Sequence, residues 1–185
     1  MSARRRLHFP KVVIRFGVVA LLALLCQAIA IKVPLGDDLP RRVLLTASYL
    51  MLLAFAAANL RRPGIAVLGL GIVLNFLPIA ANGGLMPTTP ETLLKTGDIP
   101  EAIEPGDWIP GTKDVLLERG DVRLWFLSDR FVVDEISGAF RAFSIGDVVL
   151  AAGLLITVGD LLLPRLELSA EGARAAGRDG IEATQ

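Results

Sequence analysis

The sequence has a single cysteine among its 185 residues. Cys26 therefore cannot form an internal disulfide, and one thiol alone does not make a metal site. Because it lies inside an apolar block, we interpret it as a buried, unreactive thiol. The chain also lacks an excess of charge of either sign, since 19 basic residues balance 19 acidic ones. A basic patch interleaved with aromatic residues is absent too, which argues against a nucleic-acid-binding protein.

Hydrophobic residues are abundant, at 53% of the chain, whereas soluble domains contain about 45–50%. They fall in blocks long enough to cross a bilayer as a helix, which takes about 20 residues. The pattern predicts an all-α integral membrane protein with about four transmembrane helices and a large, partly structured outer loop between the third and the fourth. The expected spans are residues 12–31, 43–60, 65–81 and 145–163.

These blocks divide the chain into four parts. We expect a three-span membrane region over residues 1–82, an outer loop region over 83–144, a fourth span over 145–165 and a disordered cytoplasmic tail over 166–185. Ala28, Ile29 and Ala30 imitate a signal-peptide cleavage site, but the length of the first block and the spans that follow favour an uncleaved helix.

The distribution of basic residues predicts the orientation. Arginines gather before the first block (residues 4–6) and between the second and third (residues 61–62), so both termini are expected in the cytoplasm. Lys32, Arg41 and Arg42 would then lie outside, against the rule. The loop after residue 83 carries more acidic than basic residues, which agrees with an outward position.

The loop region contains several local signals. Thr89 and Pro90 before an apolar pair indicate a short capped helix. Two apolar stretches flank residues 118–121, and they form either a hairpin or two short helical pieces at the membrane interface. Trp108, Trp125 and Phe126 suit the headgroup level of a bilayer.

Polar residues gather in three places near the predicted outer surface. The first place runs from Asn75 to Pro87, the second contains Asp129, and the third opens the last span with Ser144 and Asp147. We expect Asn75, Asn82, Asp129 and Asp147 to form one cluster, because the two asparagines are seven residues apart on a helix and Asp147 starts the neighbouring span. Gly83 and Gly84 permit a turn with positive φ.

Four of these residues also have a purely structural interpretation. Asn82 is suited to cap its helix, and Asn75 to join two helices by hydrogen bonds. Ser144 and Asp147 match a capping box, in which the two side chains bond to each other's backbone N–H groups.

The same residues carry a resemblance to a family of uncharacterised bacterial membrane proteins, domain-of-unknown-function family 5317. The matching pieces are the segment from Asn75 through Asn82, Gly83, Gly84 and Met86 to Pro87, then Leu127-Ser128-Asp129, then residues 143–147. The resemblance implies the membrane architecture and a bacterial cytoplasmic membrane, and it implies no activity.

A fainter similarity is to lipoprotein signal peptidase, a four-span aspartyl protease. Residues 129–134 and 143–147 resemble its two aspartate motifs, and by that similarity Asp134 and Asp147 would be the catalytic pair. Two close carboxylates can share a proton and activate water. The spacing between the motifs departs from that family, and Ser144 stands where it has asparagine.

Two hypotheses of function follow. The preferred one is a membrane protein without covalent chemistry that binds through its outer surface. Its partners would be the lipid bilayer and either a membrane protein or a lipid headgroup, and its binding residues would be Asn75, Asn82, Gly83, Gly84, Met86, Asp129 and Asp147. The alternative is an aspartyl hydrolase. A transporter is a third class, for which four spans are few. We expect no cofactor and no metal.

Overall fold

The computed structural model describes residues 7–8, 14–36, 38–96, 103–132, 142–162 and 165–166. The chain divides into two units, residues 14–157 and residues 1–13 with 158–185. In the smaller unit, β1 (Leu7–His8) pairs antiparallel with β6 (Arg165–Leu166). The larger unit contains most of the helical part of the chain.

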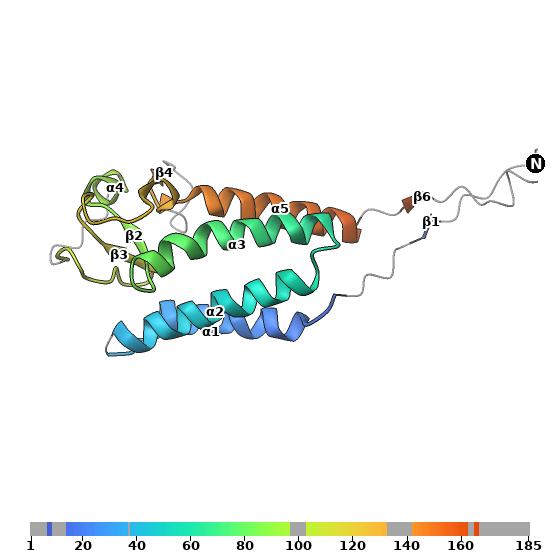
Figure 1. The fold of residues 1–185 in the computed structure, drawn as a ribbon, viewed down its shortest axis with the longest axis horizontal. Helices are drawn as coiled ribbons and strands as arrows, with labels where there is room; N and C mark the ends of the chain where they lie inside the picture. Colours follow the sequence, from blue (N-terminus) through green and yellow to red (C-terminus); the bar gives the residue numbers. More distant parts are fainter. Residues whose placement is uncertain are drawn as a thin grey trace, which may run out of the picture. The chain divides into compact units, whose positions relative to one another are not determined.

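Four helices dominate the larger unit (Figure 1). They are α1 (Gly17–Lys32), α2 (Asp38–Ala58), α3 (Pro63–Ala81) and α5 (Ile145–Leu162), the last of which runs on into the smaller unit. Among the described residues, α2, α3 and α5 are long and apolar enough to cross a membrane. The fold is therefore mainly helical, with three candidate membrane spans.

The first predicted span is shorter than the sequence suggested. α1 has 16 residues, which is about 24 Å of helix against about 30 Å of hydrocarbon. It begins after Phe16, which has a left-handed backbone (φ 56°). The side chain of Asn59, just past α2, accepts a hydrogen bond from the Arg15 N–H at 2.9 Å and donates one to the Arg15 carbonyl at 2.8 Å. Arg15, two residues before α1, is thus held to the end of α2.

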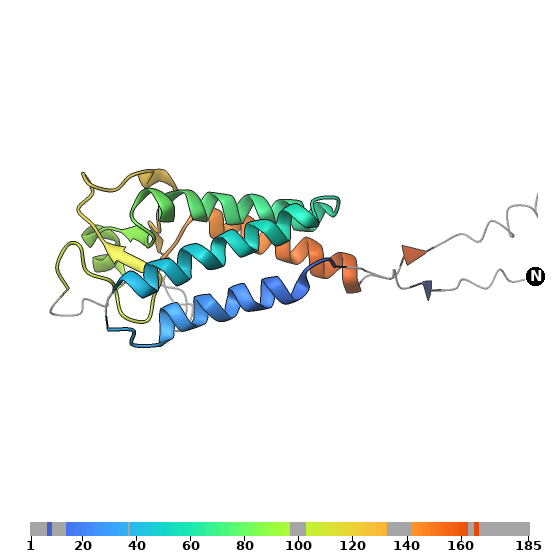
Figure 2. The same ribbon diagram turned by 60° about the horizontal axis from the view of Figure 1, so that its bottom comes forward.

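α1 and α2 form a pair joined by a short turn, and α3 returns beside α2 (Figure 2). The core of the unit is apolar, with Leu45 and Tyr49 from α2 and Ile65, Ile72 and Ile79 from α3 almost wholly buried. The three isoleucines are seven residues apart, so they lie on one face of α3. Leucines on the remaining helix surfaces are exposed in the structure, as expected for side chains that face lipid.

The described residues between α3 and α5 form a small folded part, which we call the loop module (residues 82–96, 103–132 and 142–144). Its elements are β2 (Met86–Thr88), α4 (Pro90–Lys95), β3 (Asp114–Leu116), a 3-10 turn η1 (Trp125–Leu127), β4 (Phe131–Val132) and β5 (Ala142–Phe143). The short capped helix is confirmed, because Thr89 is the N-cap of α4 and its hydroxyl accepts from the Thr92 N–H.

The hairpin alternative for residues 115–127 is contradicted. β3 pairs in parallel with β2, with Val115 opposite Pro87, and not with the segment that follows it. That segment instead forms η1, which agrees in part with the alternative of short helical pieces. The register places Val115, Leu116 and Met86 in the core, so burial of these apolar residues decides the pairing.

α3 and α5 approach each other closely along glycines. Gly64 and Gly71 on α3 are seven residues apart, as are Gly146 and Gly153 on α5, so each pair lies on one helix face. A Cβ on Gly71 would lie 2.6 Å from the Leu150 backbone N, and one on Gly64 would lie 2.5 Å from the Thr157 hydroxyl oxygen. A Cβ on Gly153 would collide with the backbone of Leu68. Small residues at these positions allow the two backbones to pack together.

This packing makes a prediction for α5. Gly153→Ala should lower the melting temperature in detergent, because overpacking typically costs about 1–3 kcal/mol, more than the gain of up to about 1 kcal/mol in helix propensity. Gly159→Ala is the control on the same helix, since a Cβ there meets no described atom within 4 Å. It should leave stability unchanged or slightly raised. Equal melting of the two variants would contradict the close approach of α3 and α5.

Candidate polar site between α3, α5 and the loop module

A buried polar group joins α3 to the start of α5. The Asn75 side chain, which is fully buried, donates from Nδ2 to Asp147 Oδ1 at 2.7 Å. The Ser144 hydroxyl donates to Asn75 Oδ1 at 2.6 Å. Both polar atoms of an amide within an apolar helix are thereby satisfied by the neighbouring helix terminus.

The capping box at the start of α5 is confirmed. Asp147 Oδ2 accepts from the Ser144 backbone N–H at 2.9 Å, and the Ser144 hydroxyl accepts from the Asp147 backbone N–H at 3.1 Å. Both carboxylate oxygens of Asp147 are therefore engaged, one by the cap and one by Asn75. Negative charge in the first turn also complements the helix dipole.

Gly146 makes room for this arrangement. A Cβ on Gly146 would collide with Asn75 Oδ1 and Cγ. The amide of Asn75 thus lies directly against the backbone of the first turn of α5, and any larger residue at position 146 would push it out of reach of Asp147 and Ser144.

A second polar pair lies in the loop module. The Asp129 side chain is 1% exposed, and its Oδ2 forms an ion pair with Lys113 Nζ. Lys113 also lies 3.5 Å from Asp114 Oδ1. Thr88 of β2 donates from its hydroxyl to the Asp129 carbonyl at 3.1 Å. These bonds hold the segment before β4 against the β2–β3 pair.

Burial governs the titration of this pair. It raises the pKa of the Asp129 carboxyl to about 8, although Lys113 acts in the opposite direction. Asp114 and Asp147 add to the rise, so the two polar groups affect each other electrostatically. Burial alone would lower the pKa of Lys113, but Asp129 and Asp114 hold it well above its usual value.

The single cluster expected from the sequence is thus divided. Asn75 and Asp147 are in direct contact, as expected, and Asp129 pairs with Lys113 instead. Asn82 lies elsewhere, because it is the C-cap of α3 and has left the helical conformation (φ −110°, ψ 31°). Its side chain bonds to the backbone of Pro78 and Arg123 and not to Asn75 or Asp147.

Asn82 connects α3 to the loop module. Its Oδ1 accepts from the Arg123 N–H at 2.9 Å, and its Nδ2 donates to the Arg123 carbonyl at 2.8 Å. Gly83 and Gly84 follow with φ of 78° and 96°, which confirms the expected turn. The Gly84 N–H donates to the Ile79 carbonyl at 2.8 Å, as in a Schellman motif. Arg42 donates to the Gly83 carbonyl at 2.9 Å from α2.

The remaining candidates from the sequence have different positions. Met86 is fully buried in the core, opposite Asp114 in the strand pair. Asp134, the other member of the suggested catalytic pair, lies outside the described residues. Among the described residues, no group of three histidine, cysteine, aspartate or glutamate side chains is placed to hold a metal ion.

Sequence reasoning missed two basic residues that matter here, Lys113 and Arg41. Arg41 is buried at the start of α2, donates to the Ala30 carbonyl, and places its guanidinium 3.3 Å from the ring centroid of Trp108. Neither has a local signature, because its partners lie in other elements. Lys113 lies between Thr112 and Asp114, directly before β3, and this polar surrounding gives no sign of its buried ion pair.

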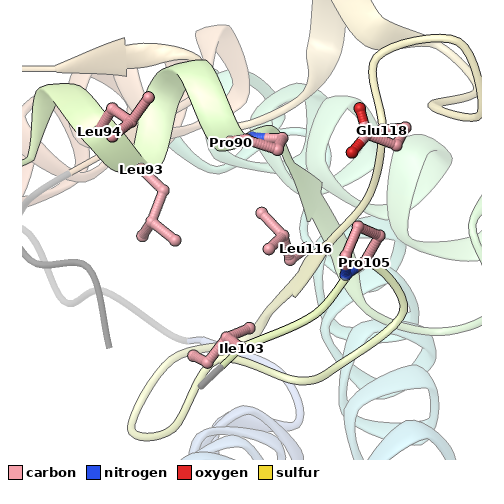
Figure 3. Close-up of a pocket in the computed structure, with 7 residues that line it drawn as sticks. All are labelled: Pro90, Leu93, Leu94, Ile103, Pro105, Leu116 and Glu118. Atoms are coloured by element: carbon pink, nitrogen blue, oxygen red, sulfur yellow. The ribbon is translucent and has the colours of Figure 1, made fainter. Parts of the chain in front are cut away.

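A hollow also opens in the loop module (Figure 3). It has a volume of about 240 Å³ and is lined by Pro90, Leu93, Leu94, Ile103, Pro105, Leu116 and Glu118. Leu93 points into the hollow from α4, Leu116 and Ile103 face it from other sides, and Glu118 stands at its edge. Among the described residues, the lining is apolar apart from this carboxylate.

Comparison with known proteins assigns the family. Residues 10–159 match the profile of a family of unknown function, DUF5317. The chain belongs to this family. The match covers α1, α2, α3, the loop module and nearly all of α5, so the polar site lies within the part that defines the family. No curated protein and no solved structure matched the chain. The similarity to lipoprotein signal peptidase therefore stays an expectation.

The geometry predicts different results for two substitutions of Asp147. Asp147→Asn should fold and melt close to wild type, because its oxygen still accepts from Ser144 and the Asn75 amide can turn over to accept from the new NH₂ group. Asp147→Leu should be clearly less stable, since it removes the cap, worth about 0.5–2 kcal/mol, and leaves the Asn75 amide without a partner, which costs about 1–3 kcal/mol.

Thermal melting of the three purified proteins in one detergent tests this. Asp38→Leu is a control for loss of a carboxylate at the start of α2, where Asp38 is partly exposed and lies 3.6 Å from Arg42, its ion-pair partner among the described residues. A leucine variant at position 147 as stable as wild type would show that the cap and the Asn75 bond do not hold α5.

Proposed function

We propose that this protein is a four-span component of the bacterial cytoplasmic membrane that binds a membrane-protein partner at its outer face without catalysing a reaction. The proposal rests on the different roles of the polar site and of the hollow in the described structure. The carboxylate of Asp147 is used in holding α3 to α5, whereas the hollow in the loop module is apolar. This combination supports a docking surface more than a catalytic centre.

The four-span arrangement is supported by the pairing of α1 with α2. Although α1 is short, the membrane can adjust to a span shorter than its hydrocarbon thickness by thinning. With both termini inside, the loop module lies outside. Lys32, Arg41 and Arg42 then lie outside as well, but each has a structural partner there, namely the Gly111 carbonyl, Trp108 and the Gly83 carbonyl.

The size and lining of the hollow favour a protein side chain as its occupant. Small-molecule sites usually measure about 300–1,000 Å³, which is larger than this hollow. Protein interfaces commonly place one large apolar anchor in such a pocket and surround it with polar contacts. Glu118 at the edge is exposed, so a basic residue beside the anchor would complement it. We propose that the partner presents an apolar residue next to a lysine or arginine.

Cysteine footprinting tests both the topology and the docking. Single cysteines replace Leu93, which lines the hollow, or Asp107, an exposed residue that is not part of the lining, in a Cys26→Ala background. A membrane-impermeant maleimide should label position 107 in right-side-out membrane vesicles as fast as in the purified protein. Position 93 should react several-fold more slowly in the vesicles than after purification, because the partner covers it only in the membrane.

Position 107 tests the topology, and position 93 tests the docking, so failure of one can be told from failure of the other. If position 107 reacts only in inside-out vesicles, the loop module faces the cytoplasm and the topology is wrong. If position 107 reacts in right-side-out vesicles but position 93 reacts equally fast there and after purification, the topology stands and the docking proposal is wrong.

A further inference from the structure

Residues 119–131 combine arginines with exposed apolar side chains. Arg119 and Arg130 each place a guanidinium over the Trp125 ring, at 4.6 and 4.5 Å from its centroid. Between them in the chain lie Leu124 and Phe126, which are 36% and 54% exposed. We call this segment the arginine–aromatic loop. Large apolar side chains exposed beside cations are typical of protein surfaces that meet a membrane.

The position of the loop along α3 is fixed by hydrogen bonds. α3 has 19 residues, which is about 28 Å of helix and close to the thickness of the hydrocarbon layer. Asn82 directly follows it, and its side chain holds the backbone N–H and carbonyl of Arg123. The residues after Arg123 therefore lie at the level where the hydrocarbon ends and the headgroups begin.

The backbone turns the loop at this level. Leu124 has a left-handed conformation with φ 56°, which is unusual for a leucine. It directly precedes the 3-10 turn η1, in which Leu127 is buried while Phe126 is exposed. Strained backbone persists where the surrounding structure enforces it, and it often marks a functional position. Here the left-handed backbone of Leu124 accompanies a change in the direction of the chain that leaves Leu124 and Phe126 on the surface.

The chemistry of the loop matches a phospholipid. Arg119, Arg123 and Arg130 offer guanidinium groups, which bind phosphate oxygens through paired hydrogen bonds. The buried Nε of Arg130 has no hydrogen-bond partner among the described residues. Acidic residues are also present, since Glu118 and Asp121 lie nearby in the chain and Glu91 is 3.9 Å from Arg119. Net charge is thus small, and the arrangement of arginines around aromatic rings is what favours a phosphate.

We propose that the arginine–aromatic loop binds the phosphate of anionic phospholipids while Leu124 and Phe126 enter the acyl region. This surface is distinct from the apolar hollow, and its occupant is the lipid membrane. Aromatic side chains at headgroup level and cations beside lipid phosphates each favour this position. The loop would fix the height of the loop module relative to the bilayer.

Depth measurement in nanodiscs provides the first test. The full chain, with Cys26→Ser, carries a nitroxide on Phe126→Cys or, as a control, on Asp107→Cys. Position 126 should be accessible to oxygen and shielded from a water-soluble nickel complex, and position 107 should show the reverse. Water accessibility at position 126 equal to that at position 107 would overturn the proposal.

Lipid retention provides the second test. Native mass spectrometry of the protein from nanodiscs containing phosphatidylglycerol and phosphatidylcholine should show preferential retention of phosphatidylglycerol. Arg123→Gln should reduce that retention about fivefold, the amount expected for one arginine near an anionic surface. This variant keeps the backbone bonds to Asn82, so the fold is preserved. Arg61→Gln is the control, since Arg61 is exposed beyond the opposite end of α3. The proposal would be refuted if both variants lost phosphatidylglycerol retention equally, or if the wild-type protein showed no preference for phosphatidylglycerol over phosphatidylcholine.

Discussion

The hydrogen bond between Asn75 and Asp147 is the constraint on which the arrangement of the larger unit depends. An asparagine in the middle of an apolar helix is costly unless both its amide atoms are bonded. Here the partner is the N-terminus of α5, which at the same time needs a capping group for its own backbone. The Asp147 carboxylate caps α5 and accepts from the Asn75 amide nitrogen, and Ser144 donates to the Asn75 amide oxygen, so α5 is fixed beside α3 in position and in height.

The glycines of α3 and α5 follow from the same constraint. A short side chain such as asparagine reaches the neighbouring helix terminus only if the backbones nearly touch, and Gly146 permits that contact. Gly71 and Gly153 continue the close approach along the two helices. At the end of α3, Asn82 performs a similar task for the loop module by bonding to the backbone of Arg123. The polar residues at this end of the helices thus position the surfaces that we propose for binding.

Much of this organisation could be predicted from the sequence, where the signal is local. The apolar blocks, the capping box of Ser144 and the turn at Gly83 and Gly84 each lie within a few residues of chain. The parallel pairing of β2 with β3, the ion pair of Lys113 and the stacking of Arg41 on Trp108 could not be predicted, because they join segments far apart in the chain. The first helix begins at Gly17 and not at residue 12, and Asn59, which is distant in the chain, bonds to the Arg15 backbone just before it.

A double-mutant cycle between Asn75 and Asp147 measures the central interaction most directly. The free energy of unfolding in detergent is compared for wild type, Asn75→Leu, Asp147→Leu and the double variant. If the bond holds α5 to α3, the losses in unfolding free energy of the two single variants will not add up in the double variant. The double variant will be about as stable as Asp147→Leu alone, with a coupling energy of about 1–3 kcal/mol, because it no longer contains the Asn75 amide that Asp147→Leu leaves unpaired. Additive losses, with coupling near zero, would contradict the account.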